Sequence, residues 1–233
     1  MNKMAIFVEG YTEVVFVDKL IWEVAEKNAV LIQWRRIAGG TTCPRRNVQI
    51  QAEGPHAGQE HFVVIHDCGG DDAVKTRMTE EYPSLAGSGY SKIVCIRDVY
   101  PRFTPAEIPD LEKGLPVFVR TKPIVVDFIL SIMEVEAWFL AEHSHFPNID
   151  ASITVPAIIA ACGFDPVNDD MQLRPTPAND MNNCYVIGGK TYEKRNALAT
   201  IEALDYAHIY AGLIDKFPYL KRLCDIIVEF LNS

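Results

Sequence analysis

The chain has 233 residues, of which 48% are apolar and 23% are charged, and this composition is typical of a soluble globular protein with a sizeable core. Its formal net charge of -9 argues against a protein whose whole surface coats nucleic acid, because such surfaces are basic. The charge does not exclude a nuclease, since carboxylates that bind metal ions add negative charge themselves.

The six cysteines form no CxxC pair, and no histidine spacing completes a zinc motif. We expect reduced thiols in the core. The sequence begins without the pattern of a signal peptide, and no apolar run approaches the ~20 residues needed to span a bilayer. These features predict a cytoplasmic protein without a membrane partner.

Apolar runs and helical spacing alternate along the first two thirds of the chain. Strands are predicted at 4–9, 30–37, 61–66, 92–96 and 123–133. Helices are predicted from Thr12 onward and at 71–82, 134–142, 153–162, 196–213 and 215–232. The polar, Gly- and Pro-containing stretch 38–60 predicts a loop or a small excursion.

Strand, helix and strand in succession indicate βαβ units and a mainly parallel sheet. We therefore predict an α/β fold in which helices flank the sheet, with a helical C-terminal lobe. The expected boundaries are an α/β domain at 1–146 and a lobe at 147–233 packed on it.

Acidic residues follow the predicted strands. Glu9, Asp67, Asp98 and Glu134 stand at strand ends, with Glu13, Asp71, Asp72 and Glu136 within about one turn. In a parallel sheet these ends share one edge, where ligands gather. Clustered carboxylate oxygens suit Mg²⁺ or Mn²⁺, and such ions position and polarise phosphate.

Each acid also has a purely structural interpretation. Asp67 is suited to a turn or a helix cap, Asp98 to a turn, and Glu13 to a solvated helix face. Glu134 and Glu136 would share a face on a strand but diverge by about 200° on a helix, so one of them is expected to point away from the site.

Basic residues offer contacts for phosphate. Arg97 adjoins Asp98, and either a catalytic contact with phosphate or an ion pair with a neighbouring acid fits this position. Arg174 and Lys122 are further candidates for binding phosphate.

The segment Phe7-Val8-Glu9-Gly10-Tyr11-Thr12-Glu13 resembles the opening motif of Toprim domains, the catalytic module of topoisomerases, primases and OLD-type nucleases. Nearly the full length resembles more closely a bacterial Toprim-like family of unsettled activity that is related to OLD-type nucleases and found beside phage-defence genes. The segments that carry this closer resemblance are the opening motif, Asp67-Cys68-Gly69-Gly70-Asp71, Arg97-Asp98-Val99-Tyr100-Pro101, Met133-Glu134-Val135-Glu136-Ala137-Trp138-Phe139 and Arg174-Pro175-Thr176-Pro177-Ala178.

The Toprim resemblance implies that Glu9 acts as a general acid/base or a metal ligand. It also implies an aspartate pair that binds Mg²⁺ at a later strand end. No Asp-x-Asp stands at such a position, so Asp67 and Asp98 are alternative partners of Glu9.

Three functions follow from these observations. The first is a Mg²⁺-dependent nuclease or phosphotransfer enzyme that acts on nucleic acid, in phage defence. The second is a non-catalytic Toprim-like module that binds or regulates a partner, such as an ATPase. The third is a nucleotide-binding enzyme, which the absence of GxGxxG and Walker motifs disfavours.

Overall fold

The computed structural model describes residues 1–25, 30–39, 43–54, 58–70 and 73–233. Contacts between Cα atoms divide the chain into two units. The sheet unit comprises Met1–Arg97, Ile108–Leu130 and Asp225–Ser233, and the helical unit comprises Asp98–Glu107 and Ser131–Cys224.

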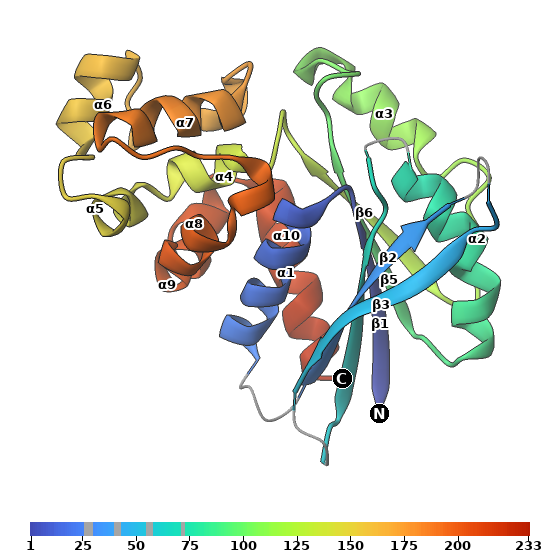
Figure 1. Ribbon diagram of the computed structural model, residues 1–233. Helices are drawn as coiled ribbons and strands as arrows, with labels where there is room; N and C mark the ends of the chain where they lie inside the picture. Colours follow the sequence, from blue (N-terminus) through green and yellow to red (C-terminus); the bar gives the residue numbers. More distant parts are fainter. Residues whose placement is uncertain (26–29, 40–42, 55–57, 71–72) are drawn as a thin grey trace. The chain divides into compact units, whose positions relative to one another are not determined.

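The sheet unit is built on a mostly parallel sheet, which confirms the predicted α/β class (Figure 1). Its strands are β1 (Asn2–Val8), β2 (Val30–Ala38), β3 (Arg46–Glu53), β4 (His61–Asp67), β5 (Lys92–Asp98) and β6 (Val125–Ser131). Their order across the sheet is β3-β2-β4-β1-β5-β6. β1 pairs in parallel with β4 and β5, so their carboxyl ends face the same way.

The prediction of a loop or a small excursion at 38–60 is wrong for Arg46–Glu53, because these residues form β3. This strand pairs antiparallel with β2. In this order β3 lies at an edge of the sheet, beside β2 alone. Its apolar residues Val48 and Ile50 are 45% and 56% exposed. A strand buried on neither face lacks the apolar run that identifies β1 and β4 in the sequence.

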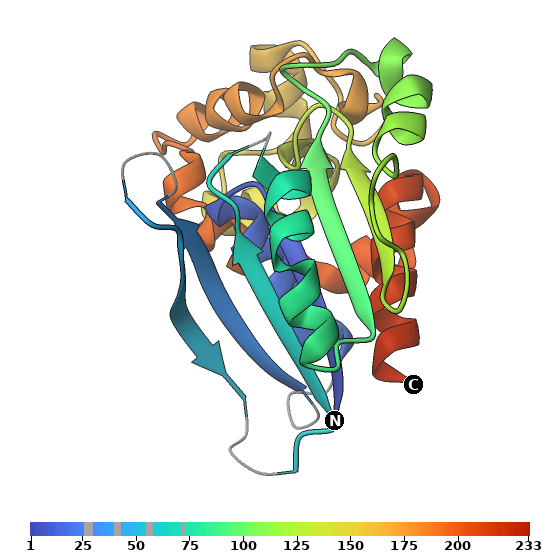
Figure 2. The same ribbon diagram turned by 90° about the vertical axis from the view of Figure 1, so that its right-hand side faces the viewer.

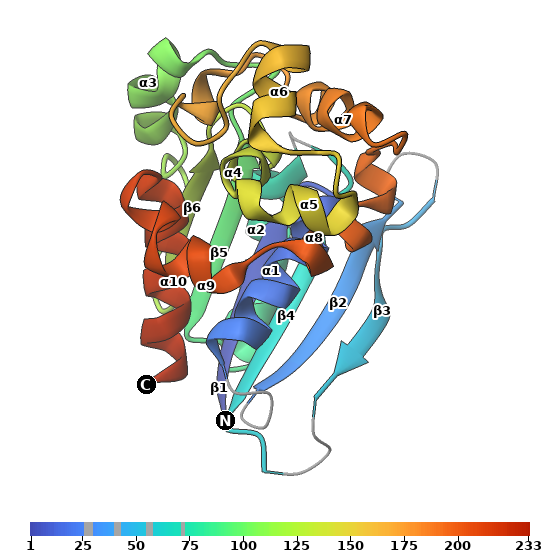
Figure 3. The same cartoon turned by 90° about the vertical axis from the view of Figure 1, so that its left-hand side faces the viewer.

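Two helices cover opposite faces of the sheet. The helices of the sheet unit are α1 (Tyr11–Val24), α2 (Ala73–Gly87), α3 (Ile108–Gly114) and the last turns of α10 (Pro218–Leu231). Figure 2 shows α2 in front of the sheet, and Figure 3 shows α1 on the other side. Alternate residues of β1 therefore face different helices, and Ala5 and Phe7 pack with Met78 and Tyr82 of α2.

The two chain ends belong to the sheet unit and meet at its surface. The Asn2 side-chain amide donates to the backbone oxygen of Ser233 at 2.7 Å. This hydrogen bond ties the start of β1 to the residues that follow α10.

The helical unit consists of short helices around Trp138, Phe139 and Phe146, which are almost fully buried. Its helices are α4 (Glu136–Ala141), α5 (Phe146–Ile149), α6 (Val155–Cys162), α7 (Pro177–Ile187), α8 (Leu198–Ala203), α9 (Tyr206–Ala211) and the first turns of α10. α7 packs on both α4 and α6. α7 lies outside the predicted helices, although its Pro177 suits the first position of a helix.

Local signals set the ends of α6 and α9. The Thr154 hydroxyl accepts from the Ala157 amide at the start of α6, and Gly163 ends it with a left-handed φ of 74°. Asp205 caps α9 by accepting from the His208 amide at 2.9 Å. The single helix predicted for 196–213 is therefore two helices, α8 and α9.

No helix among the described residues is long and apolar enough to cross a bilayer.

Candidate functional site

Glu9 and Asp67 stand at neighbouring strand ends in the sheet unit. Val8 is paired with Asp67 in the parallel register, and Glu9 follows Val8 directly. The Gly70 amide donates to the Glu9 backbone oxygen at 2.9 Å, which fastens the loop after β4 to the end of β1. Both side chains are buried. Burial raises the pKa of the Cys68 thiol, and the charges of Asp67 and Glu9 raise it further, as expected for two carboxylates near one sulfur.

Asp67 already uses both carboxylate oxygens. Oδ2 accepts from Arg36 Nε at 2.8 Å, and Oδ1 accepts from the Gly69 amide at 3.0 Å. Arg36 lies on β2 opposite Asp67, so the strand register itself creates the pair. The turn role that the sequence suggests for Asp67 is present, together with an ion pair.

Glu13 turns back toward the start of α1. Its Oε2 accepts from the Gly10 amide at 3.1 Å, one of the amides that a helix start leaves without a helical partner. This buried carboxylate therefore caps α1, in place of the solvated position considered from the sequence. Asp71, also a predicted metal ligand, lies outside the described residues.

The other predicted acids belong to the helical unit and surround Lys194. Lys194 Nζ lies 2.7 Å from Glu134 Oε1 and 3.6 Å from Glu136 Oε2. Burial alone would lower the pKa of Lys194, but the charges of Glu136, Asp98 and Glu134 outweigh it and raise the pKa. We expected Glu134 and Glu136 to point in different directions on a helix, but both lie near Lys194. Glu134 precedes α4 and Glu136 is its first residue, so the two are not both on the helix.

Glu136 is fully buried, with 0% of its surface exposed. Tyr192 donates its hydroxyl to Oε1 at 2.7 Å. Oε2 makes no hydrogen bond within the described part of the chain. Burial raises the pKa of Glu136, while the charge of Lys194 and the hydrogen bond from Tyr192 oppose the rise. Oε2 of Glu136 is thus a buried carboxylate oxygen that lies 3.6 Å from Lys194 Nζ and accepts no hydrogen bond among the described residues.

Glu134 is fixed by the start of α7. Its Oε2 accepts from the Ala178 amide at 3.0 Å, and Ala178 is the second residue of α7. Negative charge is favourable at a helix N-terminus, so α7 holds Glu134 in place independently of Lys194.

The basic residues predicted to bind phosphate have different surroundings. Arg174 is held by Asp180 through two hydrogen bonds, Nε to Oδ2 at 2.8 Å and a terminal nitrogen to Oδ1 at 2.9 Å, and stacks over Phe164. Arg97 is half-buried at the second-last position of β5, and Lys122 is exposed. The guanidinium of Arg174 is thus already engaged in an ion pair.

Sequence reasoning missed the roles of Lys194 and Tyr192. Lys194 stands 60 positions after Glu134, and Tyr192 stands 56 positions after Glu136. In the sequence Lys194 follows Gly188-Gly189 with Lys190 and Arg195 nearby, and no spacing links it to the acids.

Among the described residues, no three Asp, Glu, His or Cys side chains are arranged to hold a metal ion. Comparisons with models of protein families, with curated proteins and with solved structures find no match.

Proposed function

We propose that the protein is a Toprim-like nuclease or phosphotransfer enzyme that acts on nucleic acid with Mg²⁺ or Mn²⁺. The observation that carries the proposal is the buried Oε2 of Glu136, which makes no hydrogen bond among the described residues and lies 3.6 Å from Lys194 Nζ. A buried carboxylate oxygen without a donor is costly unless a cation compensates it. The resemblance of the opening segment to Toprim domains supports the same chemistry.

The donors fit a hard divalent cation, because Glu134, Glu136 and Asp98 offer only oxygen ligands. Among the described residues these three are not arranged to hold an ion while Lys194 lies between them, so the proposal requires that they close on the ion when Lys194 leaves. Once bound, Mg²⁺ would polarise a phosphoryl oxygen and stabilise the leaving oxygen.

The chain itself supplies the remaining groups. Tyr192 holds Glu136 in one orientation, and the amide of Ala178 does the same for Glu134. Lys194, once released from the carboxylates, donates to a phosphate oxygen as a compact point charge. The Toprim resemblance assigns the role of general acid/base to Glu9, which follows β1 in the sheet unit.

Cleavage assays test this proposal. The purified chain is incubated with single-stranded DNA, double-stranded DNA and RNA, with Mg²⁺, with Mn²⁺ and with EDTA. We expect cleavage that requires the divalent ion and is lost in Glu136→Gln. Glu9→Gln should reduce the rate by about 10²-fold or more, as for loss of a general acid/base.

Glu193→Gln is the matched control, because Glu193 is exposed and pairs with Arg195 at the surface. It should leave the rate unchanged. If every substrate stays intact with either ion, or if Glu136→Gln cleaves as fast as the parent chain, the proposed function is refuted.

A non-catalytic module is the second candidate, and one observation favours it. Lys194 already places a positive charge beside Glu134 and Glu136, so part of the negative charge of the cluster is compensated without a metal ion. In that case the chain binds or regulates a partner, such as an ATPase or a defence-system protein. Thermal unfolding with and without Mn²⁺ separates the two candidates, because an ion that binds only the folded chain raises its melting temperature.

A further inference from the structure

The helical unit contains a cavity of about 430 Å³ that lies apart from the carboxylates around Lys194. It is lined by His143, by residues 166–170, by His208 of α9 and by residues between α9 and α10. This volume is within the range of pockets that enclose small organic molecules.

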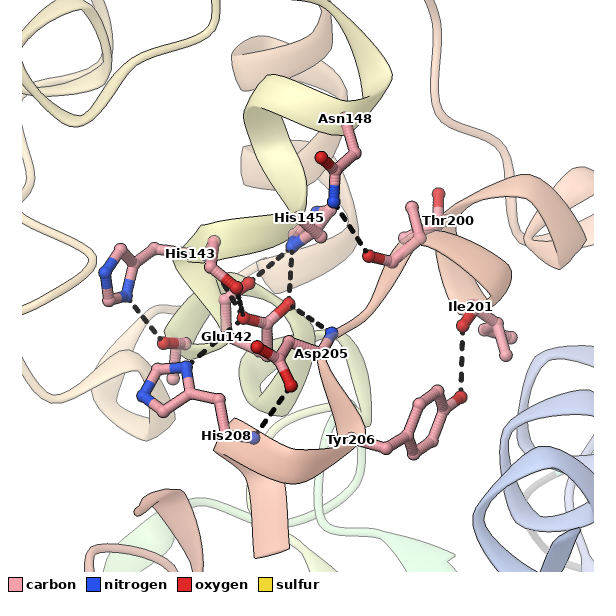
Figure 4. A network of polar contacts seen from close by, with 12 residues as sticks. Glu142, His143, His145, Asn148, Thr200, Ile201, Asp205, Tyr206 and His208 are labelled. Atoms are coloured by element: carbon pink, nitrogen blue, oxygen red, sulfur yellow. Dashed lines mark hydrogen bonds and ion pairs between the residues drawn. The ribbon is translucent and has the colours of Figure 1, made fainter. Parts of the chain in front are cut away.

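A buried carboxylate anchors one wall of the cavity. Glu142, with 0% of its surface exposed, accepts from the Ser144 hydroxyl and amide, from the Asp205 amide at 3.2 Å, and from His145. Its Oε1 also lies 3.3 Å from Nδ1 of His208 (Figure 4). Burial would raise the pKa of Glu142, but the hydrogen bonds from His145 and Ser144 outweigh it and lower the pKa.

These contacts determine which nitrogens of His143 and His208 carry hydrogen. An ionised Glu142 can only accept, so His208 carries its proton on Nδ1. His143 Nδ1 lies 3.3 Å from the backbone oxygen of Ala141, which also can only accept. Figure 4 shows the other nitrogen of each ring on the side away from Glu142. In the neutral ring of either histidine, Nε2 is therefore the nitrogen that accepts a hydrogen bond.

The remaining polar wall is acidic. Asp169 and Asp170 are exposed, and one carboxylate oxygen of each accepts a hydrogen bond from a backbone amide. The donor to Asp169 is the Asp165 amide, and the donor to Asp170 is the Gln172 amide. Lys216 is the one cation among the lining residues, and its Nζ donates to the Val167 backbone oxygen at 3.2 Å. Asp169, Asp170 and Lys216 together give the lining a net charge of -1. Most of its polar side-chain atoms are hydrogen-bond acceptors.

The other side of the cavity is apolar. Ala141, Leu213 and Phe217 are buried lining residues, and Pro166 and Val167 join them. A ligand that fills this space requires an apolar body on one side and hydrogen-bond donors on the other.

We propose that this cavity binds a small organic cation, an amine or guanidinium carried on a short apolar or aromatic body. Its N–H groups donate to Asp169, Asp170 and the Nε2 atoms of His143 and His208. Its apolar body packs on Leu213 and Phe217. Several donors on one positive head match this set of acceptors, which an anion would not.

Isothermal titration of the full chain tests the proposal with four probes. These are 2-phenylethylamine, agmatine, the neutral isostere 2-phenylethanol and the anion 3-phenylpropionate. We expect at least one of the two cations to bind more tightly than about 1 mM, at least about tenfold more tightly than the neutral isostere, and no binding of the anion.

Two variants locate the binding. The double change Asp169→Asn with Asp170→Asn should weaken binding of the cation by about tenfold or more. Gly212→Ala should also weaken it, because an added Cβ would lie 3.1 Å from Cδ2 of His208 and displace the ring. Asp215→Asn is the control: it removes one negative charge from an exposed residue outside the lining and should leave the affinity unchanged.

Circular dichroism confirms that each variant is folded before titration. The proposal is overturned if neither cation binds, if the neutral or anionic probe binds as tightly, or if the double variant binds as the parent does. Cleavage of nucleic acid enters none of these readouts, so this test and that of the proposed function fail independently.

Discussion

His66 on β4 makes the sheet unit sensitive to acid. The ring is 1% exposed, stacks on Phe7 with a centroid separation of 4.5 Å, and makes no hydrogen bond through either nitrogen within the described residues. Burial, with a smaller effect from the charge of Arg35, lowers the pKa of His66 from 6.5 to about 3. The folded chain therefore keeps His66 neutral where the unfolded chain protonates it.

The size of the effect follows from the two pKa values. Above pH 6.5 His66 is neutral in both states and has no effect on the pH dependence. As the pH falls below 6.5, the unfolded state binds the extra proton and stability is lost, until the folded state also binds it near pH 3. At pH 4.5 the loss is about 3 kcal/mol, from two pH units at about 1.4 kcal/mol each.

Urea unfolding of the parent chain and of His66→Leu at pH 8 and pH 4.5 measures this loss. At pH 8 the two should differ by less than about 1.5 kcal/mol, because the side chains are similar in volume. Between pH 8 and 4.5 the parent should lose about 3 kcal/mol more than the variant. Groups that titrate in both chains cancel in this comparison. If both chains lose the same stability, His66 is not held neutral and the reasoning is wrong.

Three further substitutions test other charged side chains. Burial raises the pKa of Asp18 from 3.8 to about 6 against a hydrogen bond from Trp34, so its stabilising effect is complete below pH 3.8 and is lost as the pH rises through 6. Asp18→Asn should therefore stabilise the chain by up to about 3 kcal/mol at pH 8 and by nothing near pH 3.5, measured by urea unfolding. Glu142→Gln should destabilise it by about 3 kcal/mol at pH 7 by the same assay, since an amide nitrogen then faces the donors around that position. Lys194→Met should strengthen Mn²⁺ binding in a calorimetric titration, because it removes a cation that competes for Glu136; unchanged affinity would contradict this.

The sequence identifies the strands that are buried on both faces, and these form the centre of the fold. The apolar runs at 61–66 and 92–96 became β4 and β5, because parallel strands covered on both faces need continuous apolar residues. The exposed β3 has no such run and was missed. The ends of these strands could be predicted from the same apolar runs. Glu9 and Asp67 were expected at strand ends, and they lie at adjacent ends.

The partners of the acids were not predictable in the same way. Arg36 meets Asp67 because β2 pairs with β4 in a particular register, which no local pattern encodes. Lys194 meets Glu134 across 60 positions of sequence through the packing of short helices. Local chemistry marks where a carboxylate stands, whereas the charge that compensates it depends on tertiary structure.

Asp67 and Asp98 are the two alternative metal ligands that the sequence suggests. They differ in the positive groups that compensate their negative charge. Asp67 has both oxygens engaged, one by Arg36 of the neighbouring strand and one by the Gly69 amide of its own turn. Asp98 instead raises the pKa of Lys194 through its charge; the Lys194 side chain is 46% exposed, and Tyr192 donates to Glu136 of the same cluster. We therefore propose Asp98, and not Asp67, as the metal ligand.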